Sequence, residues 1–247
     1  MSRGLLLAGH GSHLNPDSSA PIHAHVSHLR ERLPADVEVR AAFWKEEPAL
    51  SRALESFTSA VRDITAVPLF IAGGYFTGTV IPRELRLSGR VNTVDGHRVL
   101  YTPPIGSHPL LARVLIERAM ESGATGHEAL VILGHGTPRD PRSVTNTLLQ
   151  ADAVRNLGPF PEVATAFIDQ DPNMRDIFSL VKAPDIIMVP LFIADGWHVG
   201  QTIPGDMQID GAATVRDGRS LRFARAAGTH PAVTEVILEL FAETARW

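Results

Sequence analysis

The chain contains one segment twice. VPLFIAGGYFTGTVIP spans Val67–Pro82, and VPLFIADGWHVGQTIP spans Val189–Pro204. The two segments share their length, their opening and their ending, and they stand 122 positions apart. A repeat at such a distance means that one folding unit occurs twice, which constrains the fold more than any other feature of the sequence.

Other motifs recur at nearly the same offset. LLLAGHGS returns as LVILGHGT, AAFWKEEPAL returns as TAFIDQDPNM, and GSHP returns as GTHP. A chain of 247 residues can hold two domains of about 120 residues each. We therefore expect two similar lobes, residues 1–122 and 128–247, joined by the small, glycine-containing stretch SGATGHE (Ser122–Glu128).

Each copy alternates apolar runs of strand length with longer stretches of mixed polarity. The apolar runs are continuous, which is typical of parallel strands that are buried on both faces. The helices expected in the first copy are His23–Leu33, Ala49–Val61 and Leu110–Glu121. The sequence thus predicts an α/β protein with two tandem lobes, each a parallel sheet flanked by helices, related by a pseudo-twofold and separated by a cleft.

The repeated motifs directly follow apolar strands. Ligands of open α/β sheets bind beyond the carboxyl ends of the strands, so these motifs should gather at one edge of each sheet. In the GHG motif, His10 and His135 are flanked by glycines, which make a tight turn at little cost and let a ligand approach the backbone. The alternative is a turn histidine that only hydrogen-bonds neighbouring carbonyl groups.

The two copies differ where chemistry is expected. His198 follows the second VPLFIA and should lie near His135, and two neutral imidazoles suit divalent cobalt, iron, nickel or zinc. The first copy has Phe76 at this position, beside Tyr75. An aromatic ring cannot bind the metal, but it can stack on a flat, conjugated ligand. The alternatives are a solvated loop histidine and a core phenylalanine.

Charged side chains accompany the same motifs. A carboxylate in a cleft can accept protons or hold a metal, and the carboxylates in the turns after the strands are Glu46, Glu47, Asp169, Asp171 and Asp195. The cations that could meet substrate carboxylates are Lys45, Arg83, Arg139 and Arg142. The alternative for both groups is an ordinary solvated surface role.

Composition excludes several classes of function. The chain has 23 basic and 27 acidic residues without long runs, which argues against a nucleic-acid-binding or membrane-surface protein. It has no cysteine, which excludes thiolate metal sites and cysteine catalysis. No apolar run has the length of a signal peptide or a membrane span, so we expect a soluble cytoplasmic protein.

In the motifs GHGS, KEEP, VPLFIAGGYF, GHGT and VPLFIADGWH, and in the repeated IP endings, the chain resembles the sirohydrochlorin chelatases. These are the class II chelatases of the cobalamin and sirohaem pathways, and the resemblance is to their long, two-lobed form. It runs through both copies, from Gly4 to the last helix. It implies a lyase that inserts Co²⁺ or Fe²⁺ into sirohydrochlorin without ATP or an organic cofactor, with the tetrapyrrole between two facing lobes.

The family's histidine motifs match fully only in the second copy. The resemblance therefore implies that His135 and His198 bind the metal and act in catalysis, one of them serving as a base as the metal leaves. The acids expected to move protons are Glu47 and Asp171. The residues expected to contact the tetrapyrrole are His10, Tyr75, Phe76 and Trp197.

Three functions remain in competition at this point. The first is a cobalt-inserting sirohydrochlorin chelatase of cobalamin biosynthesis. The second is the iron-inserting enzyme of sirohaem synthesis, because two imidazoles accept both ions. The third is a non-catalytic tetrapyrrole or metal carrier on the same frame. The expected partner is sirohydrochlorin, without nucleic acid or membrane, and the sequence leaves the oligomeric state open, a monomer included.

Overall fold

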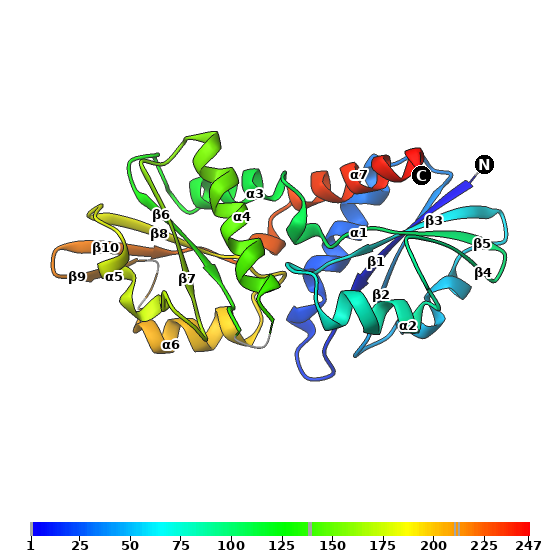
Figure 1. Ribbon diagram of the computed structural model, residues 1–247, viewed down its shortest axis with the longest axis horizontal. Coiled ribbons are helices and arrows are strands. Elements are labelled where there is room, and N and C mark those ends of the chain that lie inside the picture. Colours follow the sequence, from blue (N-terminus) through cyan, green and yellow to red (C-terminus); the bar gives the residue numbers. More distant parts are fainter. Residues whose placement is uncertain (1, 138–139, 210, 212) are drawn as a thin grey trace. The chain divides into compact units, whose positions relative to one another are not determined.

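The computed structural model describes residues 2–137, 140–209, 211 and 213–247, which form two compact α/β units (Figure 1). The first unit runs to His108 and includes Pro231–Trp247, and the second unit is Pro109–His230. Each unit has one five-stranded sheet with helices on both faces. The predicted α/β class with two similar lobes is confirmed.

The two sheets have the same strand order. The first sheet is ordered β2-β1-β3-β5-β4 and the second β7-β6-β8-β10-β9. The strands of the first are β1 (Ser2–Gly9), β2 (Val37–Phe43), β3 (Val61–Pro68), β4 (Val91–Val94) and β5 (His97–Tyr101). Those of the second are β6 (Ala129–Gly134), β7 (Glu162–Phe167), β8 (Asp185–Pro190), β9 (Ala213–Arg216) and β10 (Arg219–Phe223).

The sheets are mostly parallel, but each has one antiparallel edge strand that the sequence analysis missed. β4 pairs antiparallel with β5, and β9 with β10. A two-residue Asp-Gly turn joins each pair, and its residues have positive φ, 51° and 84° at Asp95 and Gly96. Such a turn matches the twist of a tight hairpin, so the Asp-Gly dipeptide was the available signal.

Seven α-helices lie in the described residues. They are α1 (Ala20–Arg32), α2 (Ile81–Glu84), α3 (Leu111–Glu121), α4 (Arg142–Leu157), α5 (Ile177–Leu180), α6 (Ile203–Met207) and α7 (Val233–Glu243). The helix expected over Ala49–Val61 is wrong. A 3₁₀ helix occupies Leu50–Ser56 instead, and Val61 begins β3. Phe57 ends this helix and is buried in the core of the first unit, which leaves the following apolar residues to the sheet.

The last helix of each sequence repeat packs in the other unit. α3 follows the first repeat in sequence, yet it packs against α4 and β8. α7 closes the second repeat, yet it packs against α1 and β3, and Figure 1 shows α7 beside α1. The expected division into 1–122 and 128–247 follows the repeats, whereas the compact units do not follow it.

The chain passes between the units at the repeated GSHP and GTHP motifs. The unit boundaries fall between His108 and Pro109 and between His230 and Pro231. Within these motifs, a side chain on Gly106 would overlap the carbonyl oxygen of Ile71. Gly228 is pressed in the same way against the backbone of Ile193. The glycines therefore allow the passing segment to lie directly on the loop that follows β3 or β8.

The position of α7 leads to a stability prediction. Its buried apolar side chains are Val233, Val236, Ile237, Leu240 and Phe241. Each stabilises by roughly 1.5–3 kcal/mol, so their sum approaches the 5–15 kcal/mol that a whole domain has. Deletion of residues 231–247 should unfold the first unit and leave the second folded, as measured by hydrogen exchange with peptide resolution.

Glu239→Ala on the exposed face of α7 is the control and should leave both units protected. Loss of protection in the second unit upon deletion would mean that α7 stabilises its own repeat, contrary to the packing described.

Candidate metal-binding site

The strand order of the second sheet brings three loops together. β6 is hydrogen-bonded between β7 and β8, with Gly134 opposite Phe167 and Leu133 opposite Pro190. The carboxyl ends of these three parallel strands are thus neighbours. The GHG turn, the segment beginning at Ile168 and the VPLFIA loop leave from this one edge.

The GHG turn fixes the tautomer of His135. Gly136 has φ of +66°, and the Nδ1 atom of His135 lies 2.8 Å from the carbonyl oxygen of Gly136. A carbonyl oxygen can only accept a hydrogen bond, so Nδ1 carries the proton. The lone pair of Nε2 is therefore free to bind a metal ion.

His198 supplies the second imidazole from a helix of unusual pitch. It is the first residue of a π-helix, His198–Thr202, which continues directly into α6. The ring centroids of His135 and His198 are 5.1 Å apart and the planes meet at 87°. The ring of Phe192 lies 6.3 Å from each imidazole. Short π-helical turns are frequent at functional sites, and this one brings the predicted histidine pair together.

Asp169 is the carboxylate nearest to the pair. Its Oδ2 atom lies 3.4 Å from Nδ1 of His135, on the protonated side of the ring. A carboxylate in this position stabilises the Nδ1–H tautomer and makes Nε2 a better metal ligand. The pKa of His198 lies below its ordinary value of 6.5, chiefly because burial disfavours the charged ring and also because of His135, while Asp169 opposes the shift. His198 is consequently neutral, and able to bind a metal, at neutral pH.

The arrangement fits weak metal binding. Among the described residues, no group of three or more His, Cys, Asp or Glu side chains is placed to hold a metal ion. The pair therefore offers two nitrogen ligands and leaves the other coordination positions to water or substrate. An ion held in this way can be exchanged.

The corresponding place in the first unit has different chemistry. His10 makes the same bond, with Nδ1 2.7 Å from the carbonyl oxygen of Gly11. Its ring packs edge-on against Phe76 at 4.8 Å and Trp44 at 5.4 Å between centroids. Lys45, at the position of Asp169 in the repeat, places Nζ 3.8 Å from the centre of the Trp44 ring. The first unit thus presents aromatic rings and a cation in place of a second imidazole and a carboxylate.

The other predicted acids have structural partners or solvent around them. Oε2 of Glu46 accepts the backbone N–H of Ser12 at 2.8 Å, and Oε2 of Glu47 accepts that of Ala49 at 3.0 Å. Asp171 is exposed, two residues beyond Asp169. Asp195 pairs with Arg225. The acid that the structure brings to the histidine pair is therefore Asp169.

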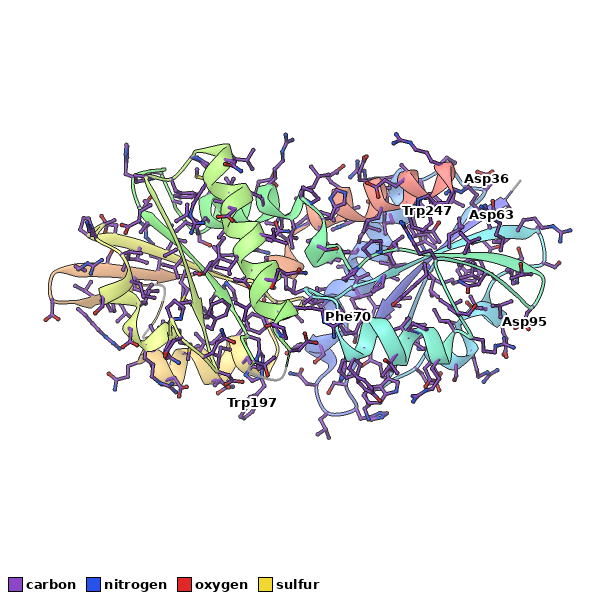
Figure 2. All side chains as sticks on the ribbon, viewed as in Figure 1. Asp36, Asp63, Phe70, Asp95, Trp197 and Trp247 are labelled. Atoms are coloured by element: carbon purple, nitrogen blue, oxygen red, sulfur yellow. The ribbon has the colours of Figure 1, made fainter. Side chains whose placement is uncertain are left out.

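Two predicted aromatic contacts are exposed on the surface. Tyr75 is 61% exposed and Trp197 is 71% exposed, and Figure 2 shows Trp197 projecting outward. Among the predicted cations, Arg83 pairs with Glu84 and Arg142 with Asp140. Arg139 lies outside the described residues.

Sequence reasoning missed Phe192, a neighbour of the pair, and Arg225, the partner of Asp195. Phe192 was overlooked because VPLF occurs in both copies and was read as strand. Arg225 belongs to no recognisable motif. The one available signal was the repeat itself, since Pro103 stands in the first copy where Arg225 stands in the second.

Comparison with known proteins gives consistent matches. The sequence model of the CbiX family matches the chain twice, over residues 4–122 and 129–244. A protein of Halobacterium salinarum, named as a probable sirohydrochlorin cobaltochelatase, is 37% identical over 271 residues, covering 98% of this chain and 91% of that protein. The sirohydrochlorin cobaltochelatase of Methanococcoides burtonii is 36% identical over 126 residues, 48% of this chain and 95% of that protein.

A solved structure that is 29% identical to the chain resembles it over almost all of its length. A multi-domain protein of Deinococcus radiodurans, described as structurally similar to chelatases with two additional novel domains, has a TM-score of 0.82 at 29% identity. The match covers 98% of this chain and 55% of that protein, so the chain spans about half of its length.

The geometry of the pair leads to a prediction about the metal-free protein. His198 should titrate below 6.5, as measured from its ring proton shifts by NMR. His135→Phe keeps a ring of similar bulk and removes the ionisable imidazole that lowers the pKa of His198, so that pKa should rise toward 6.5. Asp169→Asn should lower the pKa of His198 further, because Asp169 favours the protonated form of the His198 ring. A fall in the pKa after His135→Phe would contradict the electrostatic coupling.

Proposed function

The chain belongs to the CbiX family, and from that premise we propose that it is a sirohydrochlorin chelatase that inserts Co²⁺ without ATP. The observation that carries the proposal is the pair of imidazoles, His135 and His198, at 5.1 Å between ring centroids. The same pair is the proposed metal-binding and catalytic centre. The metal is a substrate here, and no organic cofactor is required.

Metal insertion needs an ion that is bound but still exchangeable. Four pyrrole nitrogens replace the ligands of the incoming ion, and two of them lose a proton as it enters. Two imidazole ligands hold the ion in position and leave its remaining sites open for the macrocycle. Once the ion moves to the pyrrole nitrogens, the Nε2 lone pair of a released histidine can accept one of the protons.

A carboxylate beside the pair would carry protons outward. Asp169 is the strongest choice, because its oxygen lies 3.4 Å from Nδ1 of His135 and its side chain is half exposed to water. Asp171 and Glu47, which the sequence favoured, remain proposed proton carriers to be tested beside it. The proposed tetrapyrrole contacts remain His10, Tyr75, Phe76 and Trp197, and the exposure of Tyr75 and Trp197 supports this role.

Cobalt is preferred over iron on the strength of the relatives. The proteins of Halobacterium salinarum and Methanococcoides burtonii are both named as cobaltochelatases. Two imidazoles alone bind Fe²⁺ as well as Co²⁺, so an iron-inserting enzyme is the second candidate. An anaerobic assay with sirohydrochlorin and equal free concentrations of Co²⁺, Fe²⁺ and Ni²⁺ decides between them.

The first functional prediction concerns the histidines. His135→Ala and His198→Ala should each reduce the insertion rate by more than about a hundredfold, since loss of even an outer partner of a metal ligand costs 10–100-fold. His10→Ala should cost less than about tenfold, because Phe76 offers its ring no second metal ligand. Steady-state insertion kinetics measure the effect, with folding checked by circular dichroism.

Binding of Co²⁺ alone provides the control for these variants. It should weaken in His135→Ala and His198→Ala and stay unchanged in His10→Ala. If His10→Ala were as damaging as His198→Ala, the assignment of the metal to the second unit would be wrong. A protein that binds Co²⁺ tightly but never inserts it would be a carrier.

The second functional prediction compares the acids. Asp169→Asn should lower kcat by about 10–100-fold, because it removes the carboxylate that supports the His135 tautomer. Asp171→Asn and Glu47→Gln serve as matched variants that leave this contact intact, and we expect smaller effects from them. Equal effects of all three would show that the contact with His135 is not what matters.

A further inference from the structure

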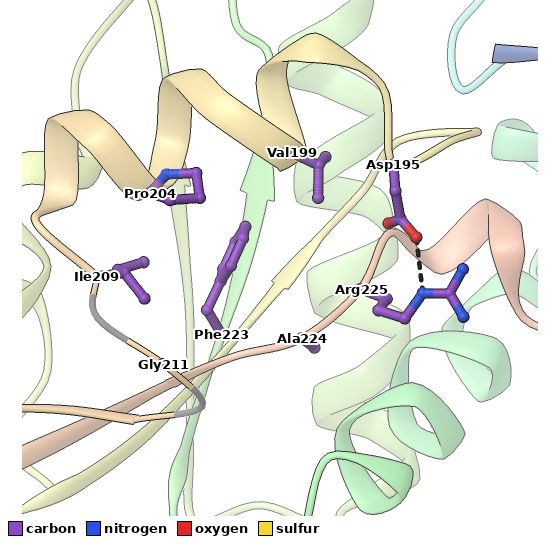
Figure 3. Close-up of a pocket in the computed structure, with 9 residues that line it drawn as sticks. Asp195, Val199, Pro204, Ile209, Gly211, Phe223, Ala224 and Arg225 are labelled. Atoms are coloured by element: carbon purple, nitrogen blue, oxygen red, sulfur yellow. Dashed lines mark hydrogen bonds and ion pairs between the residues drawn. The ribbon is translucent and has the colours of Figure 1, made fainter. Parts of the chain in front are cut away.

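A pocket of about 380 Å³ lies in the second unit, and its lining includes Val199, the residue after His198 (Figure 3). One wall comes from the helical segment that begins at His198, the other from the end of β10 and the residues after it. The apolar lining includes Val199, Pro204, Ile209 and Phe223, and the charged residues at its edge are Asp195 and Arg225. Because Val199 adjoins His198, the pocket and the metal ligand share one helical turn.

The charged pair at the edge is held in a defined orientation. Nε of Arg225 donates to Oδ2 of Asp195 at 2.7 Å, and the other oxygen of Asp195 accepts the N–H of Ala226 at 2.6 Å. The carboxylate is 26% exposed and the guanidinium 70%. Within the part of the chain that the structure describes, the two terminal nitrogens of Arg225 have no hydrogen-bond acceptor. They are free to bind an anion in fork geometry.

The same place in the first repeat is built differently. At the offset of 122 residues, Asp195 corresponds to Gly73, Arg225 to Pro103 and Phe223 to Tyr101. The hydroxyl of Tyr101 donates to the carbonyl oxygen of Thr77 at 2.6 Å and so closes the space against the helical segment. Phe223 has no hydroxyl to make that bond. Three differences, at position 195 and at positions 223 and 225, therefore meet around one pocket, and they occur in the repeat that carries the histidine pair.

A buried arginine from α3 lies close to the charged pair. Arg118 is 2% exposed and close enough for its charge to act on both Asp195 and Arg225. It donates to Oγ1 of Thr229 at 2.7 Å, and that hydroxyl donates to the carbonyl oxygen of Ala226 at 2.8 Å. The residue at this position in α7 is Leu240. The packing of α3 in the second unit thus adds a buried cation that is attracted to Asp195 and repelled by Arg225.

We propose that this pocket is a subsite for one carboxylate-bearing side chain of the tetrapyrrole substrate, with Arg225 as the carboxylate-binding residue. Asp195 is the positioning residue that holds the guanidinium at the edge of the pocket. The inference rests on the proposed function, because the acetate and propionate arms of sirohydrochlorin have the required chemistry. The apolar wall receives the methylene groups of such an arm, and the terminal nitrogens of Arg225 receive its carboxylate.

The experiment measures binding of metal-free sirohydrochlorin to the full-length protein by absorbance titration, together with kcat and KM for Co²⁺ insertion. Arg225→Met should raise both the Kd and the KM for sirohydrochlorin by about tenfold, the scale of a charge-assisted hydrogen bond, and leave kcat within about twofold. Arg225→Lys should recover part of the loss. Binding of Co²⁺ alone should match the wild type.

Arg175→Met is the matched control. Arg175 also belongs to the second unit and pairs with an aspartate, Asp206, at 2.6 Å, but it does not line the pocket. The Kd and KM of the Arg175→Met variant for sirohydrochlorin should equal those of the wild type. Asp195→Asn should raise the KM in the wild-type background and add little in the Arg225→Met background, because a positioning residue acts only through its partner.

Phe223→Tyr tests the pocket without altering a charge. Its hydroxyl should reach the carbonyl oxygen of Val199, as Tyr101 reaches that of Thr77, and raise the KM by narrowing the space. An unchanged Kd and KM in Arg225→Met, while the wild type binds sirohydrochlorin, overturns the subsite and leaves the chelatase function intact. Failure of the wild type to bind or metallate sirohydrochlorin overturns both.

Discussion

The hydrogen bond from a histidine Nδ1–H to the next residue's carbonyl oxygen is the interaction on which this site depends. It forms in both GHG turns, at 2.7 Å for His10 and 2.8 Å for His135. It requires a glycine at φ near +66°, a conformation that costs other residues roughly 1–2 kcal/mol. The bond itself contributes only about 1 kcal/mol, but it decides which nitrogen keeps a lone pair. The residues that follow the neighbouring strand then determine which side chain lies next to that nitrogen.

The two repeats show how one backbone supports two kinds of chemistry. In the second repeat, the ring of His135 lies next to His198, and Asp169 stabilises the Nδ1–H tautomer of His135. In the first, Phe76 and Lys45 stand at those positions, so a cation repels a metal ion where a carboxylate would attract one. Duplication allows this divergence because one copy can keep the histidine pair while the other copy changes. The exchange of α3 and α7 ties the repeats together, since neither unit has a complete core without a helix from the other repeat.

The repeat, the strand ends and the histidine pair could be predicted because each depends on residues close in sequence and on a constant offset. The failures depend on packing. Ala49–Val61 has a helix-like composition, but Phe57 packs in the hydrophobic core and β3 begins at Val61. Asp169 and Asp171 are equivalent in sequence, and only the turn after β7 decides which one meets His135. The pairing of Asp195 with Arg225 spans 30 positions and belongs to no local pattern, so no single-sequence motif announces it.

A site for metal insertion must bind less tightly than the product it makes. Three or four protein ligands would hold Co²⁺ as a structural ion, with an apparent binding energy of the order of 10 kcal/mol or more. Under the proposed function, two imidazoles would hold it more weakly, and four pyrrole nitrogens in one plane would then outcompete them. The same weakness leaves little capacity to distinguish Co²⁺ from Fe²⁺, because affinities of nitrogen ligands change only gradually along the first-row metals. The choice between the two metal ions therefore depends on the macrocycle and on which ions are available. The part of the substrate that the protein must recognise accurately is the tetrapyrrole.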